Sequence, residues 1–181
     1  MSTTTIFITY NPNSDLEETL AIRLHTIGVS GGFRMYLPDR FNSETILEEE
    51  TKIRISKSKY FVMFSTKPLS NIVKQEIEFA FDYLNDKSRI IVIYDKEKGK
   101  NLKGEITSHF TPFYLDKYID RQDELLKTII NTIAYKEKDT QMRTQQRNKK
   151  LQQEKDDSNA VAALLGVGLG LLVLGALNDR K

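Results

Sequence analysis

Hydrophobic and polar positions along the chain predict strands and helices in alternation. Apolar runs of strand length, rich in β-branched and aromatic residues, lie at 4–10, 33–37, 60–65 and 89–94, with a weaker one at 112–115. Between them, apolar residues recur at helical spacing in 14–27, 43 to about 55, 70 to about 85 and 120 to about 136. Strands that alternate with helices predict a doubly wound α/β domain, in which a central parallel sheet is flanked by helices.

Local signals set the expected helix boundaries. Ser14 and Glu17 have the spacing of a capping box at the start of the first helix, and Gly28 is expected to end it. The helix after Pro68 places one apolar stripe toward the core, which consists of Val73, Ile77, Ala80, Phe81 and Leu84.

The composition of the chain changes after the last predicted helix of the domain. We expect a domain at 1–135, a charged, Gln-rich linker at 136–159 that is a solvated helix or flexible, and a hydrophobic helix at 160–177. That last run has no charged side chain, and as a helix it is about 27 Å long, close to the thickness of a bilayer core. It is therefore expected either to span a membrane or to be buried in an oligomer.

The charges around this hydrophobic run indicate an orientation. Basic residues precede the run and only four residues follow it, so a helix in the inner membrane would keep the domain in the cytoplasm. Gly166 and Gly170 form a small-xxx-small pair that would let two such helices approach closely. The N-terminus has no basic leader with a long apolar region, so no signal peptide is expected.

Overall composition excludes several kinds of chemistry. The 181 residues include no cysteine, which rules out disulfides and thiolate nucleophiles, and only two histidines, His25 and His109. The net charge of +2 gives no reason to expect a nucleic-acid partner. Neither a Gly-x-Gly-x-x-Gly turn nor a phosphate-binding Gly-Lys-Ser/Thr loop is present. We expect no metal site and no bound cofactor.

In an open α/β sheet, ligands bind beyond the carboxyl ends of the strands where the strand order reverses. If the strand order is 2-1-3-4-5, that point lies between the first and third strands. The residues expected to line it come from the first, second and third strand ends, and they are Tyr10, Asn11, Asn13, Asp39, Arg40, Ser65 and Lys67.

Glu76 is the carboxylate expected nearest to this edge. On the helix after Pro68 it lies about 70° from the centre of the apolar stripe, whereas Glu78 points to the solvated side. A partly desolvated carboxylate near a helix start is a candidate for chemistry. The alternative is that Glu76 pairs with a surface charge such as Lys67 or Lys74.

Four segments within residues 4–135 carry a family resemblance: Ile6 to Tyr10 followed by Asp15, Phe33 to Arg40, Ser56 to Ser65, and Ser70 to Glu76 followed by Phe79-Ala80. Together they resemble the Toll/interleukin-1 receptor (TIR) domain of the bacterial kind, which implies a flavodoxin-like fold with a central five-stranded parallel sheet in the order 2-1-3-4-5, flanked by helices. The last segment resembles the family's Ser-x-Trp-Val-x-x-Glu sequence, whose glutamate is catalytic in NAD⁺-consuming members. Ile72 stands where the family has tryptophan, and the loop after Arg40 lacks the family's Pro-Gly.

The resemblance implies an NAD⁺ glycohydrolase or cyclase that acts on self-association in bacterial antiphage defence, downstream of a sensor. NAD⁺ would be the substrate, Glu76 the catalytic residue, and the residues that bind substrate would be Tyr10, Asn11, Asp39, Arg40, Ser65, Ile72 and Tyr83. Homo-oligomers would form through the TIR domain and the C-terminal helix. Two alternatives stay open: a non-catalytic TIR adaptor, and an effector whose hydrophobic tail disrupts the membrane.

Overall fold

The computed structural model describes residues 3–40, 46–95, 110–115 and 121–178, with side chains described as far as residue 153. The chain divides into two compact units, residues 1–132 and 133–181. The site discussed below lies entirely within the first.

A parallel sheet of five strands forms the centre of the first unit, in the order β2-β1-β3-β4-β5. This confirms the predicted strand order and direction. The strands are β1 (Thr5–Thr9), β2 (Arg34–Tyr36), β3 (Tyr60–Ser65), β4 (Ile90–Asp95) and β5 (Thr111–Leu115).

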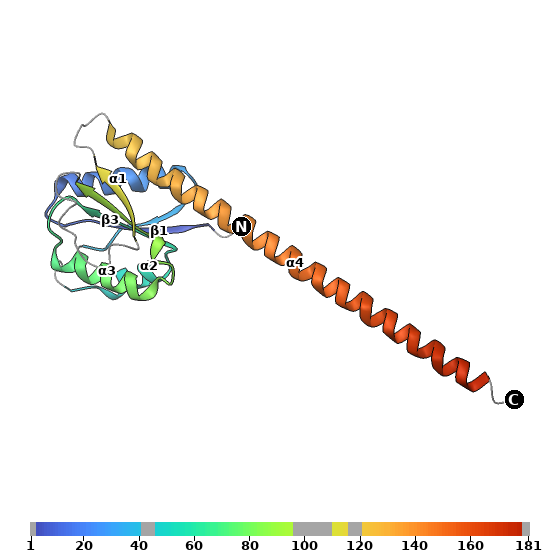
Figure 1. The fold of residues 1–181 in the computed structure, drawn as a ribbon. Coiled ribbons are helices and arrows are strands. Elements are labelled where there is room, and N and C mark those ends of the chain that lie inside the picture. Colours follow the sequence, from blue (N-terminus) through green and yellow to red (C-terminus); the bar gives the residue numbers. More distant parts are fainter. Residues whose placement is uncertain (1–2, 41–45, 96–109, 116–120, 179–181) are drawn as a thin grey trace. The chain divides into compact units, whose positions relative to one another are not determined.

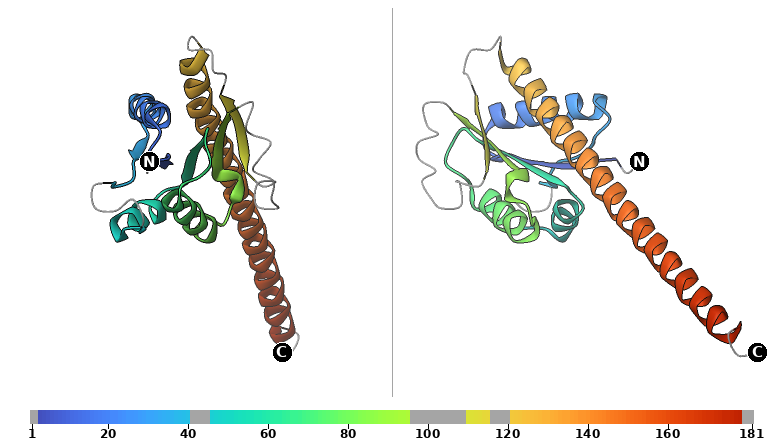
Figure 2. Two further views of the ribbon diagram at one scale, coloured as in Figure 1. Left: turned by 90° about the vertical axis from the view of Figure 1, so that its left-hand side faces the viewer. Right: turned by 45° about the vertical axis from the view of Figure 1, so that its right-hand side comes forward.

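Helices cover both faces of the sheet. In Figures 1 and 2, α1 lies on one face, while α2 and α3 lie side by side on the other. The helices are α1 (Asp15–Ser30), α2 (Glu49–Ser56), α3 (Asn71–Tyr83) and α4 (Gln122–Asn178), with a short 3₁₀ helix, η1 (Lys87–Arg89), before β4.

Every residue of β3 and β4 is buried, as expected of central parallel strands covered on both faces. Alternate residues point to opposite faces, so Phe7 of β1 and Phe61 of β3 stack at 5.6 Å between ring centres within the core cluster that α2 and α3 cover. Thr9 lies two residues beyond Phe7 and faces the same side. Its position brings its hydroxyl beneath α3.

Two predicted helix boundaries are wrong. The first helix does not end at Gly28 but continues to Ser30, with Gly31 as its C-cap. Gly28 serves packing instead, because a Cβ there would collide with the Met35 side chain of β2. The second helix begins at Glu49, and residues 46–48, which were expected to be helical, are not. Its expected start at residue 43 lies outside the described residues.

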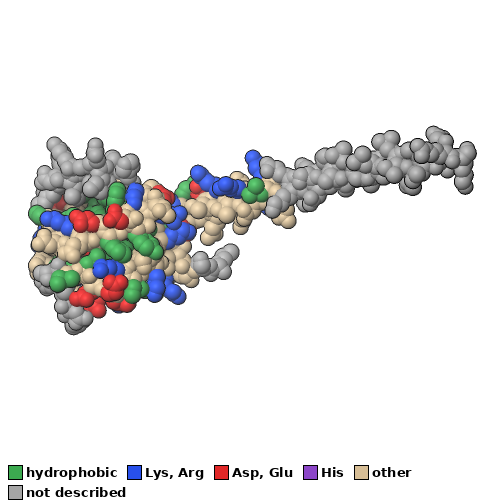
Figure 3. Space-filling view, turned by 90° about the horizontal axis from the view of Figure 1, so that it is seen from below, with side chains coloured by type: hydrophobic (Ala, Val, Ile, Leu, Met, Phe, Trp, Pro, Cys, Tyr) green, Lys and Arg blue, Asp and Glu red, His purple; other side chains and the backbone are tan. Residues whose placement is uncertain are grey.

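The expected linker at 136–159 is helical, since α4 continues through it to Asn178. Among the fully described residues, no helix is both long and apolar enough to cross a membrane. The apolar run at 160–177 lies outside the part of the chain whose side chains are described. On the face of the molecule shown in Figure 3, acidic, basic and hydrophobic side chains are interspersed.

Candidate active site

Glu76 lies in the second turn of α3, directly above the sheet. The helix begins after Ser70, whose hydroxyl accepts a hydrogen bond from the Val73 amide at 3.4 Å. The Glu76 side chain has no solvent exposure, and the buried face of α3 consists of Ile72, Val73, Glu76 and Ala80. The carboxylate is therefore inside the buried face, not at its margin as the apolar stripe predicted.

Two groups from other segments hold the carboxylate. Arg40 donates from Nη1 to Oε1 at 2.8 Å and from Nη2 to Oε2 at 2.9 Å, which makes a bidentate ion pair. The Thr9 hydroxyl at the end of β1 donates to Oε2. Arg40 also donates to the Tyr10 carbonyl at 3.1 Å and lies 5.8 Å from the centre of the Tyr10 ring. We call Thr9, Tyr10, Arg40 and Glu76 the Glu76 site.

The alternative prediction was that Glu76 pairs with a surface charge such as Lys67 or Lys74, and the structure shows a different, buried ion pair. The partner of Glu76 is Arg40, a residue predicted to line the same edge from the second loop. The sequence predicts Arg40 at this edge but not its contact with Glu76, and it predicts no role for Thr9.

Burial dominates the electrostatics of the Glu76 site. Loss of hydration raises the pKa of Glu76 above its ordinary value, even though the Arg40 charge and the hydrogen bonds from Thr9 and Arg40 act to lower it. The pKa of Tyr10 is also raised, chiefly by burial. A carboxyl group with a raised pKa is typical of sites of chemistry, and it is also found in structural ion pairs.

Arg40 closes the Glu76 site on its outer side. Its side chain retains 13% exposure while that of Glu76 has none, so Arg40 lies between the carboxylate and solvent. Its buried Nε has no hydrogen-bond partner among the described residues. A buried donor without a partner raises the free energy of the folded state, so the hydrogen bonding of Arg40 in this position is incomplete.

A second buried carboxylate, Glu17, organises the same edge of the sheet. Its Oε2 accepts from the Asn11 amide at 2.7 Å and from Asn11 Nδ2 at 2.9 Å, and its Oε1 accepts from the Thr66 amide at 2.7 Å and the Thr66 hydroxyl at 2.8 Å. The Asn11 side chain in turn accepts from the Ser70 amide at 2.8 Å. Glu17 thus joins the ends of β1 and β3 to the start of α3.

The sequence predicts only a capping role for Glu17. Half of that capping box forms, because the Ser14 hydroxyl accepts from the Glu17 amide at 3.5 Å, whereas the Glu17 carboxylate turns to Asn11 and Thr66. No local pattern identifies Thr66 as its partner, since the two residues are 49 positions apart.

Glu17→Gln is expected to lower the free energy of unfolding by about 1–3 kcal/mol, because an amide cannot accept all four hydrogen bonds and leaves a buried donor unpaired. Urea denaturation of the full chain measures this. The exposed neighbour Glu18 supplies the matched control, Glu18→Gln, which should change stability by no more than about 0.5 kcal/mol. Equal stability of the two variants would show that the four bonds do not hold this edge together.

The other predicted lining residues are partly brought together. Tyr10 and Asn11 are buried at the end of β1, and Ser65 is buried as the last residue of β3, beside the strand that carries Thr9. Asp39 precedes Arg40 and donates its amide to the Thr51 hydroxyl at 3.4 Å. These residues share the carboxyl edge of the sheet with the Glu76 site.

Two predicted substrate-binding residues lie elsewhere. Ile72 is 2% exposed and belongs to the hydrophobic core cluster, so it presents no surface to a ligand. Tyr83 follows Glu76 by seven residues, which is about 10.5 Å along a helix axis, and it lines a cleft with Lys57 and Arg89 before β3 and β4. It therefore stands at the amino edge of the sheet, whereas the Glu76 site is at the carboxyl edge.

Within the described residues, no three His, Asp or Glu side chains lie close enough together to hold a metal ion.

Comparisons with known proteins give broad similarities only. No family model matches the chain, and no curated protein matches it. Among solved structures it is similar to a diflavin flavoprotein A3 from Nostoc sp. (TM-score 0.49, 12% identity, 70% of this chain and 88% of that one). It is also similar to the Flv1 flavodiiron core from Synechocystis sp. PCC6803 (0.45, 12%, 72% and 36%). A third similar structure is that of the TIR domains of the activated Roq1 resistosome, which directly recognises the pathogen effector XopQ (0.43, 15%, 71% and 84%). At such identities and scores these structures assign no activity to this chain.

Proposed function

We propose that this protein is a TIR-type NAD⁺ glycohydrolase or ADP-ribosyl cyclase and that Glu76 is its catalytic residue. The observation that carries the proposal is the placement of this carboxylate. It is desolvated, its pKa is raised, and it stands where the carboxyl ends of β1 and β3 meet, the usual ligand site of such sheets. The sequence resemblance to TIR domains supplies the reaction.

The reaction suits a site with one carboxylate. The bond from the ribose carbon to the nicotinamide nitrogen breaks, its electron pair passes to the cationic ring, and nicotinamide leaves neutral without a general acid. Water then adds to the ribose carbon and loses a proton, which gives ADP-ribose; attack by an adenine nitrogen would give a cyclic product. Ionised Glu76 offsets the developing oxocarbenium charge and orients the ribose hydroxyls.

Arg40 has to leave Glu76 for this chemistry to occur. We assign Arg40 the following role: when NAD⁺ binds, its guanidinium group breaks the ion pair with Glu76 and pairs with the diphosphate of NAD⁺ instead. A guanidinium group binds phosphate and carboxylate with the same two-pronged geometry, so the exchange preserves its hydrogen bonds. Its position at the outer side of the Glu76 site and its unpaired Nε support this role.

Assembly completes the proposal. Homo-oligomers would form through the first unit and the long α4 helix, whose apolar run at 160–177 would pack in an oligomer or insert into the inner membrane. The domain would then lie in the cytoplasm and respond to an upstream defence sensor.

The second candidate function is a non-catalytic adaptor, and one observation favours it. Ile72 replaces the tryptophan of the family segment and lies in the core, so no ring from this position reaches the substrate site. Both functions predict assembly, and only the enzyme predicts turnover.

The test is NAD⁺ consumption by the full chain over a range of protein concentrations, with assembly followed by light scattering. We expect the rate per protein molecule to rise steeply as oligomers form. Oligomers that leave NAD⁺ intact would support the adaptor and refute the enzyme.

The pH profile of turnover should show an acid limb set by Glu76. Because the pKa of this carboxyl is raised, the ionised form is lost as the pH falls through a value above 4.5. The midpoint of log kcat/KM against pH is therefore expected above that ordinary glutamate value. A rate that stays constant down to pH 4 would contradict an ionised Glu76 as the reacting group.

A further inference from the structure

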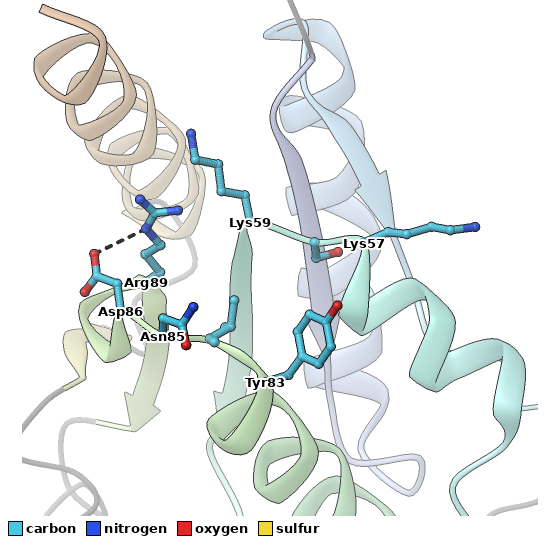
Figure 4. Close-up of a pocket in the computed structure, with 8 residues that line it drawn as sticks. Lys57, Lys59, Tyr83, Asn85, Asp86 and Arg89 are labelled. Carbon is cyan, nitrogen blue, oxygen red and sulfur yellow. Dashed lines mark hydrogen bonds and ion pairs between the residues drawn. The ribbon is translucent and has the colours of Figure 1, made fainter. Parts of the chain in front are cut away.

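A cleft of about 440 Å³ opens at the amino edge of the sheet, away from the Glu76 site. It lies between the residues that precede β3 and the connection from α3 to β4, as Figure 4 shows. Its volume falls in the range of small-molecule sites, about 300–1,000 Å³. We call it the basic cleft, and its lining residues are Lys57, Ser58, Lys59, Tyr83, Leu84, Asn85, Asp86 and Arg89.

Positive charge predominates in the basic cleft. The lining includes three cationic residues, Lys57, Lys59 and Arg89, against the single carboxylate of Asp86, and in Figure 4 the Lys57 side chain extends away from Arg89. The Asp86 carboxylate is hydrogen-bonded within its own turn, because it accepts from the Ser88 amide at 3.1 Å and from the Ser88 hydroxyl at 2.7 Å. Burial acts to raise the pKa of Asp86, but these bonds and the charge of Arg89 hold it below its ordinary value.

Arg89 is fixed in place before any ligand arrives. Its Nε donates to Asp86 at 3.2 Å, and its guanidinium lies 5.8 Å from the centre of the Tyr60 ring. The side chain is 25% exposed. A guanidinium held through Nε presents its two terminal nitrogens together, which is the geometry that binds a phosphate group.

Tyr83 supplies an aromatic wall beside these charges. Its ring stacks on Phe79 with 6.1 Å between ring centres and 12° between planes, so its orientation is set by packing. More than half of the residue, 54%, remains exposed. In Figure 4 the Tyr83 ring lies on the side of Lys57, and Arg89 lies on the side of Asp86. An exposed ring held in one orientation can stack with a planar ligand.

From these features we infer that the basic cleft binds a nucleoside monophosphate, with the phosphate on Arg89 and the base against Tyr83. The site lies at the opposite edge of the sheet from Glu76 and uses none of its residues. It is therefore independent of NAD⁺ cleavage and is a second, non-catalytic ligand site.

The test is calorimetric titration of the full chain with AMP and, separately, with inorganic phosphate. We expect Arg89→Gln to weaken AMP binding by about 10-fold to 100-fold, the worth of a charge-assisted hydrogen bond. Tyr83→Leu should weaken binding of AMP by about 10-fold and leave binding of phosphate unchanged, because only the base stacks. Arg23→Gln is the matched control, since Arg23 also pairs with an aspartate but lies on α1.

Glu76→Gln separates this site from the proposed active site. AMP binding that survives Glu76→Gln and is lost in Arg89→Gln, with thermal unfolding of the latter unchanged, would place the ligand in the basic cleft. AMP binding that is lost in Glu76→Gln but unaffected by Arg89→Gln or Tyr83→Leu would overturn the inference, as would no heat of binding at millimolar AMP. Failure of NAD⁺ turnover alone would leave the inference standing.

Discussion

Glu76→Gln is expected to reduce NAD⁺ turnover by at least about 100-fold, the usual cost of removing one group that stabilises charge in a transition state. Glutamine has nearly the same shape as glutamate and can still accept a hydrogen bond from Arg40 or Thr9, so the packing of α3 should persist. What is lost is the negative charge that offsets the oxocarbenium ion. The measurement is the initial rate of NAD⁺ loss at equal oligomer concentration.

Glu78→Gln is the matched control for this prediction. Glu78 lies two residues further along α3 and is exposed. The substitution Glu78→Gln therefore removes the same charge from the same helix without changing the Glu76 site. We expect its rate to stay within about twofold of the unsubstituted chain. Equal losses in both variants would point to a general effect on the helix or on assembly and would refute a specific role of Glu76.

Arg40→Met is expected to destabilise the fold by about 3–5 kcal/mol near neutral pH, because it leaves Glu76 as a buried charge without its cation. Methionine keeps much of the aliphatic volume, so the loss reports the ion pair. Urea denaturation measures it. Arg34→Met, at an exposed position of β2, is the control and should fall within about 0.5 kcal/mol of the original protein.

The loss in Arg40→Met should also depend on pH in a defined direction. Without Arg40, the pKa of Glu76 in the fold rises further above its unfolded value, so the neutral acid is favoured in the folded protein. Stability is then retained below the unfolded pKa and lost as the pH rises through the folded one. The double variant Arg40→Met with Glu76→Gln should recover most of the loss. No recovery would mean that Arg40 contributes through packing alone.

The parallel sheet flanked by helices was predictable because it follows from local patterns and general topology, and the strand order 2-1-3-4-5 came from the family resemblance. Apolar runs of strand length separated by amphipathic helices require parallel crossovers, and right-handed crossovers leave few arrangements. Position at a strand end also predicted which edge Tyr10, Asn11, Arg40 and Ser65 share.

The contacts inside the Glu76 site were not predictable, since they join residues far apart in sequence. Arg40 and Glu76 are 36 positions apart, and Thr9 and Glu76 are 67 apart. The apolar stripe on α3 placed Glu76 at the margin because a carboxylate counts as polar in such a pattern. Its bidentate partner and the Thr9 hydroxyl allow it to be buried all the same.

Tyr83 shows how helical spacing and distance along a helix differ. Residues seven apart share a face, which made Tyr83 a neighbour of Glu76 in projection, but they are two turns apart along the axis. The structure uses this ring at the other edge of the sheet, where it lines the basic cleft.

The central claim is that the carboxyl edge of this sheet cleaves the bond between nicotinamide and ribose. The most direct measurement is chromatographic quantification of nicotinamide released from NAD⁺ by the assembled full chain. We predict that nicotinamide accumulates mole for mole as NAD⁺ disappears, together with ADP-ribose or its cyclic form. Oligomers that release no nicotinamide, whether or not they bind NAD⁺, would contradict the claim.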